Sequence, residues 1–405
     1  MKNDNIFTGL NVLEFAWVAV GASVGKMLGG WGATVIKVET VNAPCPLRSI
    51  GPFKDMKPGL NRSAFYTWFN SDKYSLSLNM KVPEGREVAK KLISWADVVT
   101  ESYVPGTMEK WGLGYEEVKK IKPDIIYFST CMQGQTGPHS SFRGYGMHMA
   151  AMSGYYHLTG WPDRTPAGPF GAYTDFIAMP YSQTVVLAAL DYRRRTGKGI
   201  YIDLAQIESG VQFLGPLFLD YSANKKEWNR KGNRSDRYCP QGVYPCRGED
   251  RWVAIAVAND AEWQRFCQAL GNPDWTTTPE YRTVLARKDN EDQLDLLIGQ
   301  WTQNLTAEEV TKQLQSAGVS AGPMMKASDL ISDPQLKHRE SFVTLEHPEI
   351  GPHTYRPTGF KLSKTPEKLE RPAPCLGEHN EYVLQELLEM DDEELANMII
   401  TGALE

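Results

Sequence analysis

Residues 10–39 read LNVLEFAWVAVGASVGKMLGGWGATVIKVE and divide into three parts. The first part, Leu10–Phe15, is short and apolar, which predicts a buried strand. Small and apolar residues then predict a turn and a helix up to Gly30, and Trp31–Glu39 predicts a second strand that ends in an acidic residue. A strand, a turn of small residues, a helix and a strand form a βαβ unit. The stretch therefore predicts an α/β fold with a parallel sheet.

A nucleotide-binding dehydrogenase begins with the same unit, and its Gly-x-Gly-x-x-Gly turn holds the pyrophosphate. Only Gly21 and Gly25 fall in the turn here, and their spacing does not match that pattern. Glu39 is suited either to hold a ribose or to be a surface charge at the end of a strand. The dehydrogenase is therefore the less favoured alternative. The next residues, 42–61, are rich in proline and glycine and predict a long surface loop.

The composition is that of an ordinary globular protein. The chain has 405 residues, 41% of them hydrophobic and 23% charged, which suffices for two domains. The formal net charge of -6 argues against a nucleic-acid partner. No apolar run reaches ~18 residues and no signal-peptide pattern is present, so we expect no membrane span and a cytoplasmic location. Because the histidines and cysteines lack ligand spacing, we expect reduced thiols and no metal site.

Residues 168–199, GPFGAYTDFIAMPYSQTVVLAALDYRRRTGKG, place Asp175 between a glycine- and proline-rich approach and the uncharged run Met179–Leu190. The bases Arg193–Arg195, followed by Gly197, indicate the end of a helix. We therefore expect Asp175 in the approach to a buried helix or in its first turn, where the helix dipole and free N–H groups favour an acid. On spacing alone, a capping acid is the simpler interpretation.

Several separated stretches resemble the class III CoA-transferases, the family of the carnitine and formyl-CoA transferases. They occur in the family's order and extend from Leu10 to Ala403. The clearest are NSDKYSLSLNMK (70–81), ESYVPGTMEKWGL (101–113), QGQTGP (133–138), the Asp175 stretch and PAPCLGE (372–378). The resemblance implies a large Rossmann-like α/β domain with a mostly parallel sheet built from both chain ends, a smaller α+β domain and an interlocked dimer. The boundaries we expect are 1–224 for the first part of the large domain, 225–325 for the small domain and 326–405 for the return.

The resemblance also implies a reaction. Asp175 is the nucleophile of that family, and it carries CoA as an aspartyl-CoA thioester from a donor acyl-CoA to an acceptor carboxylic acid. CoA is then a substrate, and no permanently bound cofactor is implied. A dry site favours this chemistry because water weakens a carboxylate nucleophile. Two histidines, His148 and His157, are further candidate bases. The residues implied to contact CoA are Val18, Ala19, Thr40, Leu78, Asn79, Met80, Lys81, Ser102, Tyr103, Lys110, Cys131 and Gln133.

Aromatic residues close to Asp175 in the sequence predict an apolar pocket. They are Tyr155, Tyr156, Trp161, Phe170, Tyr173, Phe176 and Tyr181. We therefore expect CoA transfer from a donor such as succinyl-CoA to an aryl or arylalkyl acid, for example an arylsuccinate as in the benzylsuccinate branch of the family. A carnitine-like cation is the alternative acceptor. A dicarboxylate acceptor needs a basic group from elsewhere, such as Arg143, Arg164 or the run 225–237. For the chain as a whole, a non-catalytic partner subunit of a two-chain transferase is the alternative.

Overall fold

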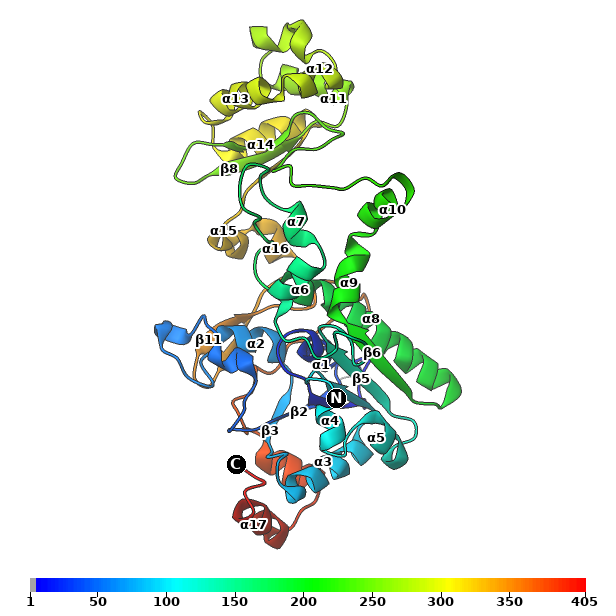
Figure 1. Cartoon of the computed structure of the whole chain (residues 1–405). Helices are drawn as coiled ribbons and strands as arrows, with labels where there is room; N and C mark the ends of the chain where they lie inside the picture. The colour runs from blue at the N-terminus through cyan, green and yellow to red at the C-terminus, as the bar shows by residue number, and fades with distance from the viewer. Residues whose placement is uncertain (1–4) are drawn as a thin grey trace. The chain divides into compact units, whose positions relative to one another are not determined.

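The computed structural model describes residues 5–405, and the chain forms two compact units. The larger unit contains residues 5–155, 168–227 and 337–405. The smaller unit contains residues 156–167 and 228–336. Figure 1 shows the elements of both units, which we describe separately.

A six-stranded sheet forms the centre of the larger unit (Figure 1). Its strand order is β3-β2-β1-β4-β5-β6, and every neighbouring pair is parallel. This order reverses direction between β1 and β4, and ligands of such sheets bind in the crevice outside the carboxyl ends of the strands at that point. The predicted α/β fold with a parallel sheet is confirmed. The strands are β1 (Asn11–Phe15), β2 (Thr34–Glu39), β3 (Tyr74–Ser77), β4 (Val98–Glu101), β5 (Ile126–Cys131) and β6 (Ile200–Ala205).

Helices cover both faces of this sheet. On one face, α1 (Val20–Gly30) and α8 (Tyr173–Thr196) bury side chains against β1, β2, β4 and β5. On the other face, α3 (Pro83–Trp95) and α5 (Tyr115–Ile121) pack against the alternate residues of the strands. Parallel strands that are buried on both faces read as nearly continuous apolar runs. The first strand could therefore be predicted from its apolar run in the sequence.

The remaining elements of the larger unit are shorter. Residues 337–405 join this unit but add no strand to its six-stranded sheet. Two short helices, α7 (Tyr155–Leu158) and α16 (Pro334–His338), lie where the chain passes between units. The others are α2 (Ala64–Asn70), α4 (Thr107–Lys110), α6 (Gly146–Met152), α9 (Gln206–Phe213), α10 (Gly215–Asn224), the hairpin β10 (Val343–His347) and β11 (Gly351–Tyr355), a π-helical turn (Tyr382–Leu387) and α17 (Asp392–Ile400).

The smaller unit has its own core around an antiparallel sheet in the order β7-β8-β9. Three tryptophans, at 263, 275 and 301, contribute to this core. Its strands are β7 (Gln241–Pro245), β8 (Trp252–Ala256) and β9 (Ser320–Pro323), and its helices are α11 (Asp260–Ala269), α12 (Val284–Asp289), α13 (Glu291–Thr302), α14 (Ala307–Ser316) and α15 (Ala327–Ser332).

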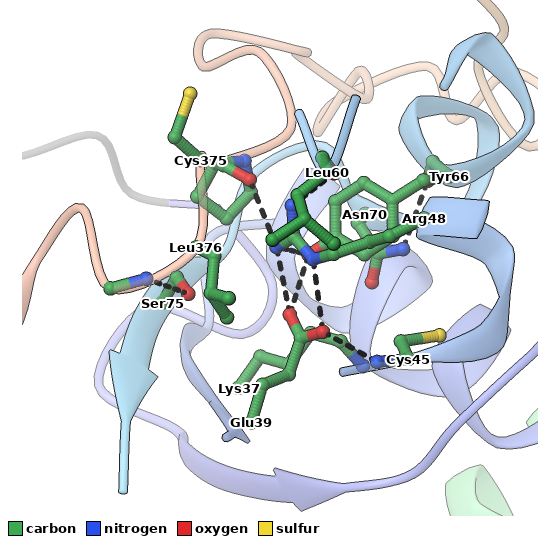
Figure 2. Close-up of polar contacts among 12 residues, drawn as sticks. Lys37, Glu39, Cys45, Arg48, Leu60, Tyr66, Asn70, Ser75, Cys375 and Leu376 are labelled. Atoms are coloured by element: carbon green, nitrogen blue, oxygen red, sulfur yellow. Dashed lines mark hydrogen bonds and ion pairs between the residues drawn. The ribbon is translucent and has the colours of Figure 1, made fainter. Parts of the chain in front are cut away.

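Glu39, at the end of β2, is fully buried in an ion pair with Arg48 (Figure 2). The Arg48 guanidinium donates to both carboxylate oxygens, at 2.8 and 3.0 Å, and the Tyr66 hydroxyl donates to one of them at 2.9 Å. Burial raises the pKa of Glu39, but the charges of Arg48 and Lys37 and the hydrogen bonds from Arg48 and the Cys45 N–H together outweigh burial and lower this pKa to about 2. Both interpretations of Glu39 from the sequence are therefore wrong, since it neither faces solvent nor has a free oxygen for a ribose.

The same contacts correct one part of the predicted surface loop over 42–61: residues 49–60 are mostly exposed, as predicted, but three residues near the start of the stretch are buried. Cys45, Leu47 and Arg48 are buried in this stretch, and short 3-10 turns cover Pro46–Ser49 and Lys54–Met56. Residues 45–48 fold inward because the Cys45 N–H and the Arg48 side chain both donate hydrogen bonds to the Glu39 carboxylate. A proline- and glycine-rich composition gave no sign of this partner.

A second buried cluster lies beneath the turn between β1 and α1. Glu14 accepts hydrogen bonds from the ammonium groups of Lys37, at 3.0 Å, and Lys73, at 2.8 and 2.9 Å. Burial lowers the pKa of Lys73 to about 8 although Glu14 opposes the change. A Cβ on Gly25 would lie 2.0 Å from a Glu14 oxygen, so only glycine lets α1 approach this closely. The glycine that resembles a dinucleotide loop therefore serves helix packing.

We predict that Glu39→Gln lowers the free energy of unfolding by about 3–5 kcal/mol, because it leaves the buried Arg48 charge without its partner. Urea unfolding at pH 7 measures the change. Because the pKa of Glu39 is about 2 in the folded chain and 4.5 ordinarily, its stabilisation is complete above pH 4.5 and declines as the pH falls toward 2. Glu87→Gln, which breaks an exposed pair with Lys90, is the control and should change stability by less than ~0.5 kcal/mol. Equal effects of the two substitutions would show that the buried pair of Glu39 with Arg48 matters no more to stability than an exposed pair.

Candidate active site

A cavity of about 820 Å³ opens at the carboxyl ends of the strands in the larger unit. Its wall contains residues that follow each of the first five strands: Val18 and Ala19 after β1, Thr40 after β2, Leu78 after β3, Ser102 after β4 and Cys131 at the end of β5. The carboxyl ends of parallel strands meet at one edge of a sheet, which brings these distant residues together. The volume lies in the range of cofactor and substrate sites.

Eleven of the thirteen site residues predicted from the sequence line this cavity. The exceptions are Lys110 and Gln133. Lys110 is exposed at the end of α4, and the Gln133 amide contacts the sulfur atoms of Met149 and Met152 at 3.7 and 3.6 Å. The eleven are Val18, Ala19, Thr40, Leu78, Asn79, Met80, Lys81, Ser102, Tyr103, Cys131 and Asp175.

Asp175 lies in the first turn of α8, as the sequence predicts. Asp175 is only 5% exposed. Within residues 5–405 its carboxylate accepts no hydrogen bond, so Asp175 does not cap the helix. A Cβ on Gly146 would lie 2.4 Å from one of its oxygens, and the Thr174 hydroxyl donates to the Gly146 carbonyl at 2.8 Å. The start of α6 is thus held directly against the carboxylate.

Burial raises the pKa of Asp175 to about 7. No cation within the described residues offsets this desolvation, in contrast to Glu39. A carboxylate that has lost its hydration and has no partner is poised either to attack an electrophile or to exchange a proton near neutral pH. A structural capping acid has the opposite properties, because N–H donors lower its pKa.

The turn after β1 is strained and tightly held. Val18 has φ 58°, a left-handed conformation that a β-branched residue rarely adopts. The Trp17 N–H donates to the Ser102 hydroxyl at 2.7 Å, and that hydroxyl donates back to the Trp17 carbonyl at 2.9 Å. The Tyr103 ring packs edge-on against Trp17 with 4.8 Å between centroids. Ser102 and Tyr103 therefore shape the wall by fixing this turn.

Two cations line the wall, Lys81 and Arg143. Within residues 5–405, neither side chain forms an ion pair or a hydrogen bond, so both are available to an anionic ligand. His148 also lines the cavity, but its Nδ1 accepts from the Tyr145 N–H at 3.1 Å and is engaged in the cap of α6. His157 belongs to the smaller unit and does not line the cavity.

None of the seven aromatic residues near Asp175 in the sequence lines this cavity. Tyr155 packs against Tyr173, Phe176 lies 6.2 Å from Phe69 between ring centroids, and Phe170 is fully exposed. Successive residues of a helix point in different directions, so nearness in sequence does not place a side chain in the site. The aromatic residues that do line it are Trp17, Tyr103, Trp111, Phe142 and Tyr145.

Residues 5–405 contain no set of three or more histidine, cysteine, aspartate or glutamate side chains arranged to hold a metal ion. Over the same residues, no helix has both the length and the apolarity needed to cross a membrane. All six cysteines are free thiols.

The raised pKa of Asp175 has a consequence for stability. Between pH 3.8 and 7 the unfolded chain ionises this group while the folded chain keeps it protonated, so its contribution to stability falls as the pH rises. We predict that Asp175→Asn, which stays neutral, stabilises the fold more at pH 7.5 than at pH 4, by up to about 4 kcal/mol. Urea unfolding of both proteins at the two pH values measures this. The same stabilisation at both would contradict it.

Comparisons with known proteins agree with this geometry. The profile of CoA-transferase family III matches residues 7–380. The chain is 31% identical over 387 residues to a succinyl-CoA–D-citramalate CoA-transferase of Chloroflexus aurantiacus, covering 96% of this chain and 95% of that one. It is 32% identical over 399 residues to the succinyl-CoA:glutarate CoA-transferase of Mus musculus, covering 98% and 90%.

A solved structure shows the same fold. The crystal structure of a CAIB/BAIF family protein from Brucella suis superimposes with a TM-score of 0.86 and 31% sequence identity, over 95% of this chain and 99% of that one. The matches extend over nearly all of the chain, and the cavity lies where this fold binds its ligands. The chain belongs to CoA-transferase family III and is an enzyme that transfers CoA.

Proposed function

We propose that the enzyme moves CoA from succinyl-CoA to a dicarboxylic acid through a covalent intermediate on Asp175. The observation that carries this proposal is the state of Asp175, which is a buried carboxylate without a hydrogen-bond partner on the wall of the cavity. Desolvation strengthens a carboxylate nucleophile. No other acidic group on the wall is comparable, because Glu39 is neutralised by Arg48.

The steps balance without a redox partner. An Asp175 oxygen attacks the thioester carbonyl of the donor, and the C–S bond breaks. This step releases CoA as a thiolate and leaves a mixed anhydride between the donor acyl group and Asp175. The thiolate attacks the aspartyl carbonyl, which releases the donor acid and leaves an aspartyl-CoA thioester. The acceptor carboxylate then attacks this thioester, and CoA returns to the new acyl group by the reverse steps. Asp175 must be ionised to begin, so a pKa of about 7 allows the reaction at neutral pH.

Arg143 is the observation that favours a dicarboxylate acceptor. It lines the same cavity as Asp175 and has no ion pair within residues 5–405. A guanidinium binds a carboxylate with two parallel hydrogen bonds, so it is suited to hold the end of the acceptor that does not react. The relatives named for citramalate and glutarate act on dicarboxylates of this kind. An arylsuccinate is the second candidate. It also has two carboxylates, and its ring could pack against Trp17, Phe142 and Tyr145 on the wall.

We also propose that the chain assembles as a dimer. Helix α10 has no buried residue, although Phe218, Leu219 and Tyr221 on it are apolar or aromatic and are 48%, 71% and 49% exposed. Exposed apolar surface of this kind is typical of a face that another protein covers. A second copy of this chain is the occupant that the family resemblance implies, and the alternative is a related subunit. The mass of the purified protein in solution tests the proposal.

We predict that Asp175→Ala lowers the rate of CoA transfer by about a thousandfold or more, because the covalent step loses its nucleophile. Incubation with succinyl-CoA, followed by borohydride or hydroxylamine and peptide mapping, should label Asp175 in the wild-type chain. Asp191→Asn, which changes an exposed acid on the same helix, is the control and should leave both results unchanged.

A label on another residue would overturn the nucleophile assignment. Absence of both label and transfer in the chain purified alone, restored by a related chain that carries its own aspartate, would instead support the non-catalytic partner subunit. Full activity of Asp175→Ala would reject the covalent mechanism.

We predict that Arg143→Met raises the KM for glutarate or citramalate about tenfold or more, because a charge-assisted hydrogen bond contributes about 1.5–3 kcal/mol. The KM for phenylacetate, which has one carboxylate, should not change. Transfer assays with succinyl-CoA as the donor measure both. Arg164→Met is the matched control, because Arg164 is exposed in the smaller unit. Phenylacetate used better than every dicarboxylate would favour the aryl acceptor.

A further inference from the structure

Gln206 is a residue of the cavity wall that the sequence did not indicate. It is the first residue of α9 and directly follows the carboxyl end of β6. The Ile207 N–H donates to the Met132 carbonyl at 3.0 Å, and Met132 lies on the wall after β5. The position of Gln206 on the wall is therefore fixed by the sheet and by the turn beside it.

Helix α9 packs against α6 and α8, the two helices that meet at Asp175 (Figure 1). The packing is close, because a Cβ on Gly210 would lie 3.2 Å from Cγ2 of Thr174 and 2.8 Å from the Ser153 hydroxyl. Thr174 directly precedes Asp175 on α8. Gln206 lies one helical turn before Gly210, so the two share a face of α9 and are about 6 Å apart along its axis. The Gln206 side chain therefore reaches the same region of the cavity wall as Asp175.

The side-chain amide of Gln206 has no partner within residues 5–405. Its oxygen is buried and accepts no hydrogen bond, and its nitrogen donates none. The other side-chain amides among the described residues of the wall are engaged, since Asn42 donates to the Glu405 carboxylate and Asn79 donates to a backbone carbonyl. A buried polar group without a partner destabilises a fold, which makes the Gln206 amide a candidate for binding a ligand.

The reaction proposed at Asp175 needs a donor of this kind. When an Asp175 oxygen adds to a carbonyl carbon, the carbonyl oxygen carries a negative charge until the next bond breaks. An N–H group that is already in place stabilises this charge without reorganisation. A neutral amide has a further advantage over a cation, because a cation beside Asp175 would pair with the carboxylate and weaken it as a nucleophile. Gln206 therefore has the chemistry that this position requires.

We propose that Gln206 is a catalytic residue whose side-chain N–H donates a hydrogen bond to the oxyanion of the tetrahedral intermediates formed at Asp175. This inference rests on the proposed covalent mechanism. In the first step, an Asp175 oxygen bonds to the thioester carbon, and the electron pair of the C=O bond moves to the oxygen beside Gln206. The pair returns when the C–S bond breaks and CoA leaves as a thiolate. Gln206 gives up and accepts no proton, and the same contact serves each later addition.

The substitution Gln206→Met tests the proposal, because methionine has a similar length and shape but no N–H group. The rate at which succinyl-CoA labels Asp175, trapped with borohydride or hydroxylamine in a single turnover, should fall about a hundredfold. The kcat of transfer should fall by a similar factor, whereas the KM for glutarate and the affinity for CoA should not change. The midpoint of urea unfolding should stay the same or rise, since the variant lacks the unpartnered amide oxygen.

The control is Gln212→Met, the same change at an exposed position of α9, which should leave labelling and transfer unchanged. Labelling of Gln206→Met at the wild-type rate would overturn the proposal. A raised KM for glutarate with kcat unchanged would also overturn it, because the amide would then bind the acceptor. Lower stability with equal losses of CoA binding and transfer would do so too, because the amide would then support the wall. Absence of label on Asp175 in the wild-type chain would instead reject the covalent mechanism, and this inference with it.

Discussion

The structure around the site depends on charges that are buried together beneath the carboxyl ends of β1 and β2. Glu14 is shared by Lys37 and Lys73, and Glu39 is paired with Arg48. Buried ion pairs are weak sources of net stability, but a broken pair is costly because it leaves a charge without solvent or partner. These contacts therefore fix one arrangement of the chain, because any other arrangement of the turns at this edge would leave a buried charge without its partner.

The consequence for the cavity is a rigid turn after β1. Lys37 donates to the Ala16 carbonyl at 2.6 Å and Lys73 to the Ala22 carbonyl at 2.8 Å, one on each side of Val18. A β-branched residue at positive φ costs about 1–3 kcal/mol and persists only where its surroundings hold it. The buried ammonium groups and the Ser102 hydroxyl are those surroundings. Preorganisation of this kind removes the need to order the wall when a substrate binds.

The elements that the sequence predicted are those with strong local patterns. β1, α1 and β2 follow from apolar runs and small residues, and the first turn of α8 follows from Asp175 and the basic residues before Gly197. The residues of the wall came from the family resemblance, because they are far apart in sequence and meet only through strand order. The sequence did not predict which side chains contact each other. No local pattern indicates that Glu39 pairs with Arg48, that Gly146 lies against Asp175 or that Phe176 packs outside the cavity.

Two carboxylates of the same unit show why partners matter more than burial. Glu39 and Asp175 are both almost fully buried, yet the pKa of Glu39 is about 2 and that of Asp175 is about 7. The first has a guanidinium and a hydroxyl against it, while the second lies against Gly146 at the start of α6 and accepts no hydrogen bond within residues 5–405. The oxygens of Glu39 are occupied by Arg48 and serve the structure, so Glu39 is a poor nucleophile. The oxygens of Asp175 have no donor, so their lone pairs are available to a substrate. Chemistry at this cavity therefore depends on two features of the fold: Asp175 lacks hydrogen-bond partners, and Glu39 has them.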